Sequence, residues 1–214
     1  MECITLENTL PDVFVSECIP GSDVWKADLS FRRGGLYLVE AASGGGKSSL
    51  CAYMFGSRTD YQGRILFDDT DIRSLSVAGW LEIRRRHIAY LPQELSLFPE
   101  LTAWENIQLK NRLTGYASDK MVTRWLDMLG IDSRRDHPAG KLSIGQQQRV
   151  AIIRAVCQPF DFLLLDEPVS HLDETNNSIA AALIAEEAAR QGAAVISTSV
   201  GNHISLQYTH RMQL

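Results

Sequence analysis

Three consecutive glycines, set between a short apolar run and a helical pattern, constrain the fold of this chain more than any other feature. The apolar run is Leu36–Glu40, the glycines are Gly44, Gly45 and Gly46, and the helical pattern covers residues 47–55. A chain that leaves a strand, turns through glycines and enters a helix at once is typical of a strand–helix–strand unit. We therefore expect an α/β protein whose sheet includes Leu36–Glu40.

Further short apolar runs predict more buried strands of the same sheet. They lie at Ile88–Leu91 and at residues 160–165 and 194–197, without alternation between apolar and polar residues. This pattern is typical of parallel strands that are covered on both faces. Longer helical patterns lie between them, such as residues 174–190 before Gly192, so the connections are expected to be crossovers.

Two parts of the chain depart from this alternation. The stretch up to Phe31 predicts antiparallel strands, whereas residues 99–144 read as helices without core strands. Thr102 and Glu105 have the spacing of a capping box, and residues 118–129 predict a second helix. We expect this segment to be a helical insert between two strands of the sheet.

The length and the charge limit the classes to which the protein can belong. A chain of 214 residues, 45% hydrophobic and 22% charged, is expected to form one globular domain with a subdomain, and its composition excludes collagen-like and disordered classes. The formal net charge of −5 weighs against binding to nucleic acid. The basic run from Arg84 to His87 is interpreted as a solvated helix end.

The sequence predicts a protein of the cytosol. No apolar run approaches the roughly 18–20 residues of a membrane span, and no secretory signal is visible at the N-terminus. The four cysteines, Cys3, Cys18, Cys51 and Cys157, are scattered without close pairs. We expect them to be reduced thiols.

The run from Ala41 to Ser49 predicts a phosphate-binding loop. Glycines let successive backbone N–H groups converge on phosphate oxygens, and the following helix N-terminus adds partial positive charge. Lys47 is expected to reach the β- and γ-phosphates and Ser48 to hold Mg²⁺. Ala41 stands where the usual pattern has a glycine, a departure that a negative φ tolerates; the alternative is a flexible glycine-rich loop beside an unrelated Lys-Ser pair. The predicted nucleotide-binding residues of this loop are Ser43, Gly44, Gly45, Gly46, Lys47, Ser48 and Ser49.

Two adjacent acids, Asp166 and Glu167, end another predicted strand. A carboxylate at the carboxyl end of a parallel strand lies where α/β sheets bind ligands. Asp166 can hold Mg²⁺ there, and Glu167 can orient and deprotonate an attacking water. The alternative is that the acids only cap the next helix.

Further motifs resemble those of the ATP-binding cassette (ABC) ATPases. Residues 142–155 resemble the signature and its helix, residues 90–93 the Q-loop, and residues 169–173 the D-loop. Residues 63–68 resemble the strand after the first helix, and the stretch after the Q-loop is similar to that of lipoprotein-releasing and macrolide-export cassettes. The resemblance covers about residues 4–214.

This resemblance implies a P-loop NTPase fold with a mostly parallel sheet, an N-terminal antiparallel part and a helical subdomain. It implies one nucleotide-binding domain over residues 1–214, with residues 1–92 and 157–214 as the ATPase core and about 93–156 as the helical part. It also implies Glu167 as catalytic base, Gln93 as a γ-phosphate sensor and Mg²⁺ ligand beside Ser48 and Asp166, and Asp173 in the D-loop.

The signature predicts a second anion site. Ser143 can cap a helix with Gln146 in a capping box, and a helix N-terminus with a hydroxyl and the small Gly145 attracts an anion. In the family this site binds the ATP of a partner subunit, so two chains would sandwich two ATP molecules head to tail. The signature residues are Leu142, Ser143, Ile144, Gly145 and Gln146.

Three positions differ from the family pattern or leave alternatives open. Ile144 replaces a signature glycine, pointing either toward the nucleotide or away from it. The family places a switch histidine after residues 193–198, where this chain has Ser199; either Ser199 occupies that place, which we favour, or His203 reaches back to it. Phe14 and Trp25 are both candidates for the aromatic residue that stacks on adenine, or they belong to the core.

The resemblance implies an ATP-binding and ATP-hydrolysing subunit of an ABC transporter. It implies ATP and Mg²⁺ as ligands, an ATP-dependent homodimer, and a separate transmembrane permease that places the chain at the cytoplasmic face of a membrane. Because serine lacks the charge of an imidazolium, we expect hydrolysis to be slow. The alternative is a degenerate soluble module of the same family that dimerises on ATP without a permease.

Overall fold

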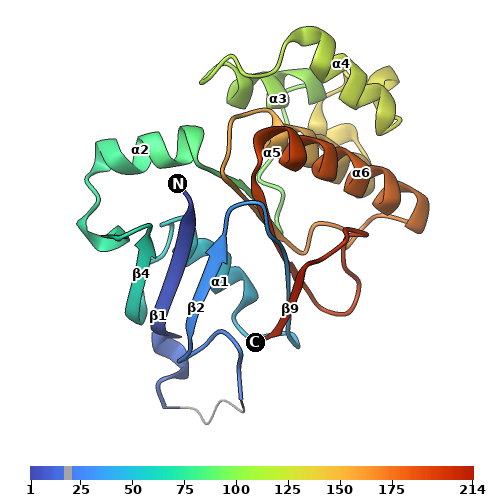
Figure 1. The fold of residues 1–214 in the computed structure, drawn as a ribbon. Helices are drawn as coiled ribbons and strands as arrows, with labels where there is room; N and C mark the ends of the chain where they lie inside the picture. The colour runs from blue at the N-terminus through green and yellow to red at the C-terminus, as the bar shows by residue number, and fades with distance from the viewer. Residues whose placement is uncertain (17–20) are drawn as a thin grey trace.

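The computed structural model describes residues 1–16 and 21–214, so Cys18 lies outside the described part (Figure 1). The helices are α1 (Lys47–Met54), α2 (Val77–Arg86), α3 (Ala103–Asn111), α4 (Asp119–Met128), α5 (Ile144–Val156) and α6 (Glu174–Gln191). The strands are β1 (Cys3–Pro11), β2 (Asp28–Arg32), β3 (Leu36–Glu40), β4 (Tyr61–Phe67), β5 (Thr70–Asp71), β6 (Ile88–Leu91), β7 (Phe162–Asp166), β8 (Ala194–Ser199) and β9 (His210–Gln213). Short 3₁₀ turns lie at Asp12–Phe14, Ile72–Ser74, Asp132–Arg134 and Ala139–Lys141.

The main sheet has five strands in the order β6-β7-β8-β3-β9, and each paired neighbour runs parallel. All four apolar runs of the sequence form strands of this sheet, although β7 and β8 extend to Asp166 and Ser199, beyond the predicted ends. Every residue of β7 is buried, which explains why its sequence shows no alternation.

A second sheet, of order β2-β1-β4-β5, is antiparallel. It confirms the antiparallel part predicted for the N-terminal stretch. The sheet also recruits β4 and β5, which follow α1 in the chain. In Figure 1 these strands lie below α2.

Helices and the second sheet cover the two faces of the parallel sheet. Alternate residues of β7 divide between two hydrophobic clusters: Phe162 and Leu164 belong to the cluster with α1 and the antiparallel sheet, and Leu163 and Leu165 to the cluster with α5 and α6. The second cluster continues without a break into α3 and α4, which lie at the top of Figure 1.

Local capping explains where the helices of the insert begin. Thr102 accepts a hydrogen bond from the backbone N–H of Glu105, whose carboxylate accepts one from the backbone N–H of Thr102, so the predicted capping box is present. Ser118 caps α4 by accepting a hydrogen bond from the backbone N–H of Met121. Gly192 ends α6 with a φ of 60°, the left-handed conformation that glycine adopts at no cost.

The basic end of α2 is not simply solvated, which corrects the interpretation of Arg84. Its guanidinium donates to the carbonyl oxygens of Phe55 and Gly56, at 3.1 and 2.8 Å, and lies over the Trp80 ring. Arg84 therefore satisfies the last carbonyls of α1 and joins α2 to it, whereas Arg85 is exposed.

The described cysteines are free, as predicted. Cys51 and Cys157 are buried, and burial raises the pKa of both thiols, so they are inert core residues. Within residues 1–16 and 21–214, none of the helices combines the length and the apolar character that a bilayer crossing requires.

Candidate nucleotide-binding site

The glycine-rich loop, Ser199 and the Asp-Glu pair lie at the carboxyl edge of three neighbouring parallel strands. Strand β8 lies between β3 and β7, with Ser199 opposite Glu40 and Thr198 opposite Asp166. The backbone N–H of Ala41 donates to the carbonyl of Ser199 at 3.2 Å. The glycine-rich loop and the Asp-Glu pair, far apart in the sequence, therefore begin beside each other.

The glycines of the loop are required by its backbone. Gly44 has a φ of 83° and Gly46, the N-cap of α1, a φ of 91°, both in the left-handed region. A Cβ on Gly45 would lie 2.9 Å from the Cβ of Ala41. The alanine at position 41 is thus accommodated because residue 45 has no side chain, and its own φ lies outside the left-handed region.

The Lys47 side chain lies inside the loop and is 5% exposed. Its Nζ donates to the carbonyl oxygens of Ala41 and Ala42 at 3.3 and 3.0 Å and lies 3.7 Å from Oε1 of Glu167. A cation held in the curve of a loop whose N–H groups converge is the arrangement that binds the terminal phosphates of a nucleotide.

Thr198 holds the two acids in place, a role that the sequence did not reveal. Its hydroxyl donates to Oδ1 of Asp166 at 2.8 Å and accepts a bond from the backbone N–H of Glu167 at 3.3 Å. Glu167 has a φ of 49°, and its side chain turns toward Lys47. The acids do not serve merely as a helix cap, since α6 begins after Asp173.

A pocket of about 260 Å³ opens in front of the loop. Its walls bring together most of the predicted nucleotide residues with Gln93 of the Q-loop and the predicted base Glu167: Ser43, Gly44, Gly46, Lys47, Ser48, Ser49, Gln93 and Glu167. The hydroxyl of Ser49 already accepts a bond from Arg58 at 2.9 Å, whereas Ser43 and Ser48 are exposed at the mouth.

The donors around this pocket fit Mg²⁺ bound together with phosphate. The described residues contain no cluster of three or more His, Cys, Asp or Glu that could hold a metal alone. The buried carboxylate of Asp166 ends β7, and the exposed hydroxyl of Ser48 lies in the cradle, the loop of residues 41–49. Mg²⁺ prefers few protein oxygens completed by phosphate and water, and this set supplies them.

The two aromatic candidates have different places. Trp25 is 4% exposed, and its indole Nε1 donates to the Gly45 carbonyl at 3.2 Å, so it supports the loop from within. Phe14 is half-buried, with its ring 3.0 Å from the position that a Cβ on Gly46 would take. Of the two, Phe14 is the more exposed.

Neither candidate for the switch position lines the pocket. Ser199 is fully buried at the end of β8, and its hydroxyl donates to the Asn202 carbonyl at 2.7 Å. His203 lines a separate pocket with Val169 and Leu172 of the D-loop. Of the two candidates, only Ser199 lies on β8, the strand between the loop and the acids. Its assignment to the switch position remains a prediction.

The signature lies on the surface at the start of α5. Ser143 and Gln146 form the predicted capping box, and Ser143 is exposed. The Ile144 side chain is 48% exposed, so it points to solvent. A Cβ on Gly145 would lie 2.9 Å from the His171 carbonyl, which leaves no room there for any other residue. Leu142 is buried and anchors the segment.

The D-loop is tied to the signature helix by Gln148, which the sequence did not single out. Its side-chain amide donates to the Pro168 carbonyl and accepts from the backbone N–H of His171 at 3.0 Å. Asp173 is exposed and caps α6, and the backbone N–H of Asn176 lowers the pKa of its carboxyl.

A parallel sheet with a glycine loop, a buried lysine and an Asp-Glu pair on neighbouring strands defines a P-loop nucleotide-binding protein. The family model described as "ABC transporter" matches residues 25–170. The chain belongs to this family as an ATP-binding cassette, an ATPase with the P-loop fold.

Known proteins with similar sequences carry corresponding names. The chain is 37% identical over 156 residues to the lipoprotein-releasing system ATP-binding protein LolD of Syntrophotalea carbinolica, covering 71% of this chain and 69% of that protein. It is 33% identical over 155 residues to the ABC transporter ATP-binding protein YtrE of Bacillus subtilis, with 71% and 67% covered.

Solved structures agree in fold. The dimeric structure of MJ0796, described as a bacterial ABC transporter cassette, superposes with a TM-score of 0.76 at 26% identity, over 91% of this chain and 87% of that one. A second MJ0796 structure, described as a post-hydrolysis state bound to ADP and Pi, has a TM-score of 0.77 at 24% identity over 93% and 88%, and supports the fold alone.

Proposed function

We propose that two copies of this chain bind ATP between them, hydrolyse it with Mg²⁺, and drive a separate membrane permease. The observation that carries the dimer is the exposure of Ser143 at the helix N-terminus of α5, while the cradle in the same chain is lined by its own Gln93 and Glu167. A helix N-terminus with a free hydroxyl attracts an anion, and the γ-phosphate of a partner's ATP is the anion that this family supplies.

The residues of the cradle and its surroundings have separate roles in binding and hydrolysing ATP. Lys47 and the loop N–H groups bind the β- and γ-phosphates, and Phe14 stacks on the adenine. Ser48 and Asp166, with Gln93 nearby, would hold Mg²⁺, which would supply positive charge to neutralise the phosphates. Glu167 orients a water and accepts its proton as the water oxygen bonds to the γ-phosphorus and the bond to the β-phosphate oxygen breaks.

We expect turnover to be slow. A histidine at the switch position would add positive charge near the γ-phosphate in the transition state, whereas Ser199 adds none. The retained base, Glu167, keeps the reaction available. Asp173 and the signature complete the site of the partner copy.

The proposed permease determines where the chain lies in the cell and which part of the chain makes contact with the membrane protein. We infer that the chain lies at the cytoplasmic face of a membrane, held by a permease of the lipoprotein-releasing or macrolide-export type. Residues 93–156 would act as the helical part that meets the permease, and residues 1–92 and 157–214 as the ATPase core. ATP favours the closed dimer and hydrolysis reopens it, so the permease follows a two-state change.

The test combines dimerisation with capture of the membrane partner. Glu167→Gln should slow turnover and trap an ATP-bound dimer, seen as a doubled mass in size-exclusion chromatography with ATP and Mg²⁺; a monomer under these conditions would refute the sandwich. A tagged wild-type chain should co-purify with a membrane protein from detergent extracts. An ATP-dependent dimer that retains no membrane protein would favour the alternative, a soluble module without a permease.

A further inference from the structure

Trp25 is a buried hydrogen-bond donor that lies against the phosphate-binding loop. Its indole Nε1 donates to the Gly45 carbonyl at 3.2 Å, and its side chain is 4% exposed. Trp25 lies outside the loop, between β1 and β2, where its backbone N–H donates to the Ser22 hydroxyl at 2.9 Å. Its ring also meets the Tyr53 ring of α1 edge-on, with centroids 6.5 Å apart. The donor is therefore held by contacts that need no nucleotide.

The bond to Trp25 fixes the direction of the peptide unit that joins Gly45 to Gly46. In a planar trans peptide the C=O and the N–H point in opposite directions. Gly46 lines the pocket in front of the loop, whereas Trp25 is not among the described residues that line it. Because the Gly45 carbonyl is turned to Trp25, the Gly46 N–H is turned toward the pocket. Among the described residues this N–H has no acceptor, so it is available to a ligand.

The same peptide unit could turn over at little cost if nothing held it. Neither Gly45 nor Gly46 has a side chain, and glycine tolerates φ angles of either sign. Half a turn of the unit would exchange the positions of the carbonyl and the N–H. The carbonyl oxygen, which carries partial negative charge, would then face the pocket and repel a phosphate.

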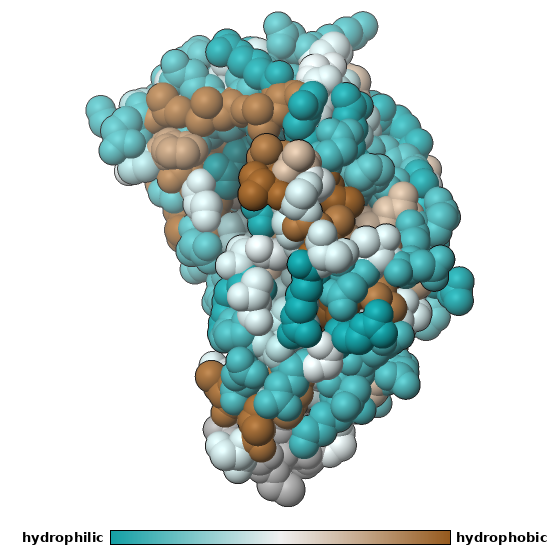
Figure 2. All heavy atoms as spheres, turned by 90° about the vertical axis from the view of Figure 1, so that its left-hand side faces the viewer, coloured by the Kyte–Doolittle hydropathy of each residue, from teal (hydrophilic) through white to brown (hydrophobic). Residues whose placement is uncertain are grey.

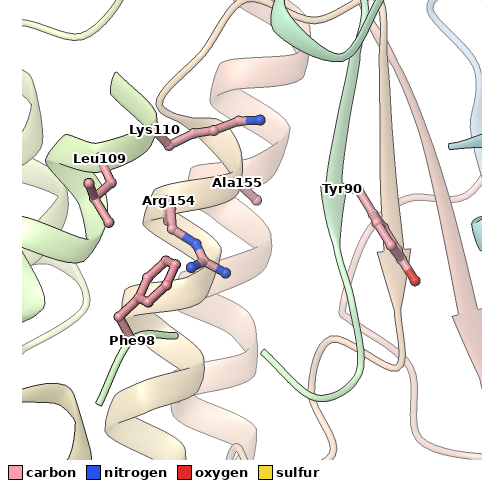
Figure 3. Close-up of a pocket in the computed structure, with 6 residues that line it drawn as sticks. All are labelled: Tyr90, Phe98, Leu109, Lys110, Arg154 and Ala155. Carbon is pink, nitrogen blue, oxygen red and sulfur yellow. The ribbon is translucent and has the colours of Figure 1, made fainter. Parts of the chain in front are cut away.

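The pocket depends on its backbone N–H groups because its lining has few cations. A second pocket, of about 210 Å³, has two in its lining, Lys110 of α3 and Arg154 of α5 (Figure 3). Among the described residues that line the pocket in front of the loop, Lys47 alone is positively charged, and Glu167 is acidic. A triphosphate carries several negative charges, so most of its hydrogen bonds there must come from N–H groups and hydroxyls.

Exposed apolar side chains lie around Phe14 rather than Trp25. Val13 and Val15, the neighbours of Phe14, are 59 and 47% exposed. The space-filling view shows separate hydrophobic areas on a largely hydrophilic surface, one of them near its lower end, at the height where β1 ends in Figure 1 (Figure 2). A nucleotide base would find apolar surface at this turn, whereas Trp25 offers its N–H to the loop and little of its ring to solvent.

We propose that Trp25 is a positioning residue for phosphate binding: it turns the Gly45 carbonyl away from the pocket and so aims the Gly46 N–H at a phosphate oxygen. The proposal rests on the proposed role of residues 41–49 as the phosphate cradle. A donor that is aimed before the ligand arrives raises affinity, because binding need not order it. This role differs from adenine stacking and from core packing, since it predicts an effect on phosphate that is independent of the base.

The experiment separates the phosphates from the base. Trp25→Phe keeps a buried aromatic ring and removes the N–H donor. Competition with a fluorescent ATP analogue, in the presence of Mg²⁺, measures the affinities of ATP and of inorganic tripolyphosphate, which has no adenine. We expect both affinities to fall by the same factor, about three- to tenfold, as for the loss of one neutral hydrogen bond.

Two control variants accompany this measurement. Trp125→Phe makes the same change at a buried tryptophan of α4, in the other hydrophobic cluster, and should leave both affinities unchanged. Phe14→Leu should weaken ATP and leave tripolyphosphate unchanged. A loss for ATP alone in Trp25→Phe would assign Trp25 to the adenine, and no loss for either probe would assign it to the core; both results overturn the proposal.

A measurement on the wild-type chain does not depend on the folding of the variant. The indole N–H signal of Trp25 in a ¹⁵N-labelled sample is assigned by elimination, using Phe variants of the other three tryptophans, Trp80, Trp104 and Trp125. We expect this N–H to exchange slowly with solvent before nucleotide is added and after ADP and Mg²⁺ are added. Fast exchange before nucleotide is added would overturn the proposal.

Lys47→Ala distinguishes failure of this inference from failure of the proposed function. If Lys47→Ala loses both probes while Trp25→Phe binds them as tightly as the wild type, only the role of Trp25 is refuted. If Lys47→Ala binds ATP as tightly as the wild type, or the wild type binds ATP but no tripolyphosphate, the cradle itself is refuted and the role of Trp25 with it.

Discussion

Replacing Thr198 by valine tests whether one hydroxyl holds the two acids of the site. Valine has nearly the same shape, so it removes the donor to Asp166 without leaving a cavity. Thr198 is fully buried and Asp166 is 1% exposed, so water does not readily replace the lost bond. A hydrogen bond to a charged group contributes about 1.5–3 kcal/mol, and a buried partner left without one costs about as much.

We therefore expect Thr198→Val to lower the free energy of unfolding by about 2–3 kcal/mol. For a chain of 214 residues this corresponds to a fall in Tm of roughly 4–12 °C. Phosphate release per folded molecule should fall about tenfold, because Asp166 and the Glu167 backbone lose their common anchor. Urea unfolding and a phosphate-release assay measure the two effects.

Thr198→Ser is the matched control. It keeps the hydroxyl and loses one methyl group, which costs about 1 kcal/mol in a core. Turnover should stay close to that of the wild type. A valine variant within about 0.5 kcal/mol of the wild type, or as active as the serine variant, would refute the role assigned to this hydroxyl.

Two further substitutions test the cradle and the switch position. Lys47→Ala should abolish measurable ATP binding in isothermal titration, since Nζ is the cation inside the loop; unchanged affinity would contradict the P-loop assignment. Ser199→His should raise the hydrolysis rate per folded molecule, at a cost of about 1–3 kcal/mol in stability because the site is fully buried; no gain in rate, together with a loss of activity in His203→Ala, would instead assign the role to His203.

The parts of the fold that depend on neighbours in sequence were predicted well. Apolar runs identified the strands Leu36–Glu40 and Ile88–Leu91 to the residue, because both are buried without alternation. The capping residues Thr102 and Ser143 were identified because a cap is set by residues three positions apart. Local sequence patterns also identified the loop of residues 41–49 and the acids Asp166 and Glu167, because each directly follows or ends an apolar run.

Contacts between distant segments were not predicted. The indole of Trp25 meets Gly45 and the guanidinium of Arg84 meets the end of α1 only after the chain has folded. A tryptophan near a loop and an arginine in a basic run have many other uses, so the sequence did not distinguish these roles. Thr198 was overlooked for the same reason, since its partner Asp166 lies on another strand.

The contacts of Gln148 bear on how a partner copy would meet this chain. Its buried amide bonds Pro168, just before the D-loop, and His171 within it, and the His171 carbonyl fits only against a glycine at position 145. The signature and the D-loop are thus joined within one chain by the contacts of Gly145 and Gln148 with His171. If Ser143 meets a partner's phosphate as proposed, we expect the D-loop to move with it, so that the two elements reach the partner together.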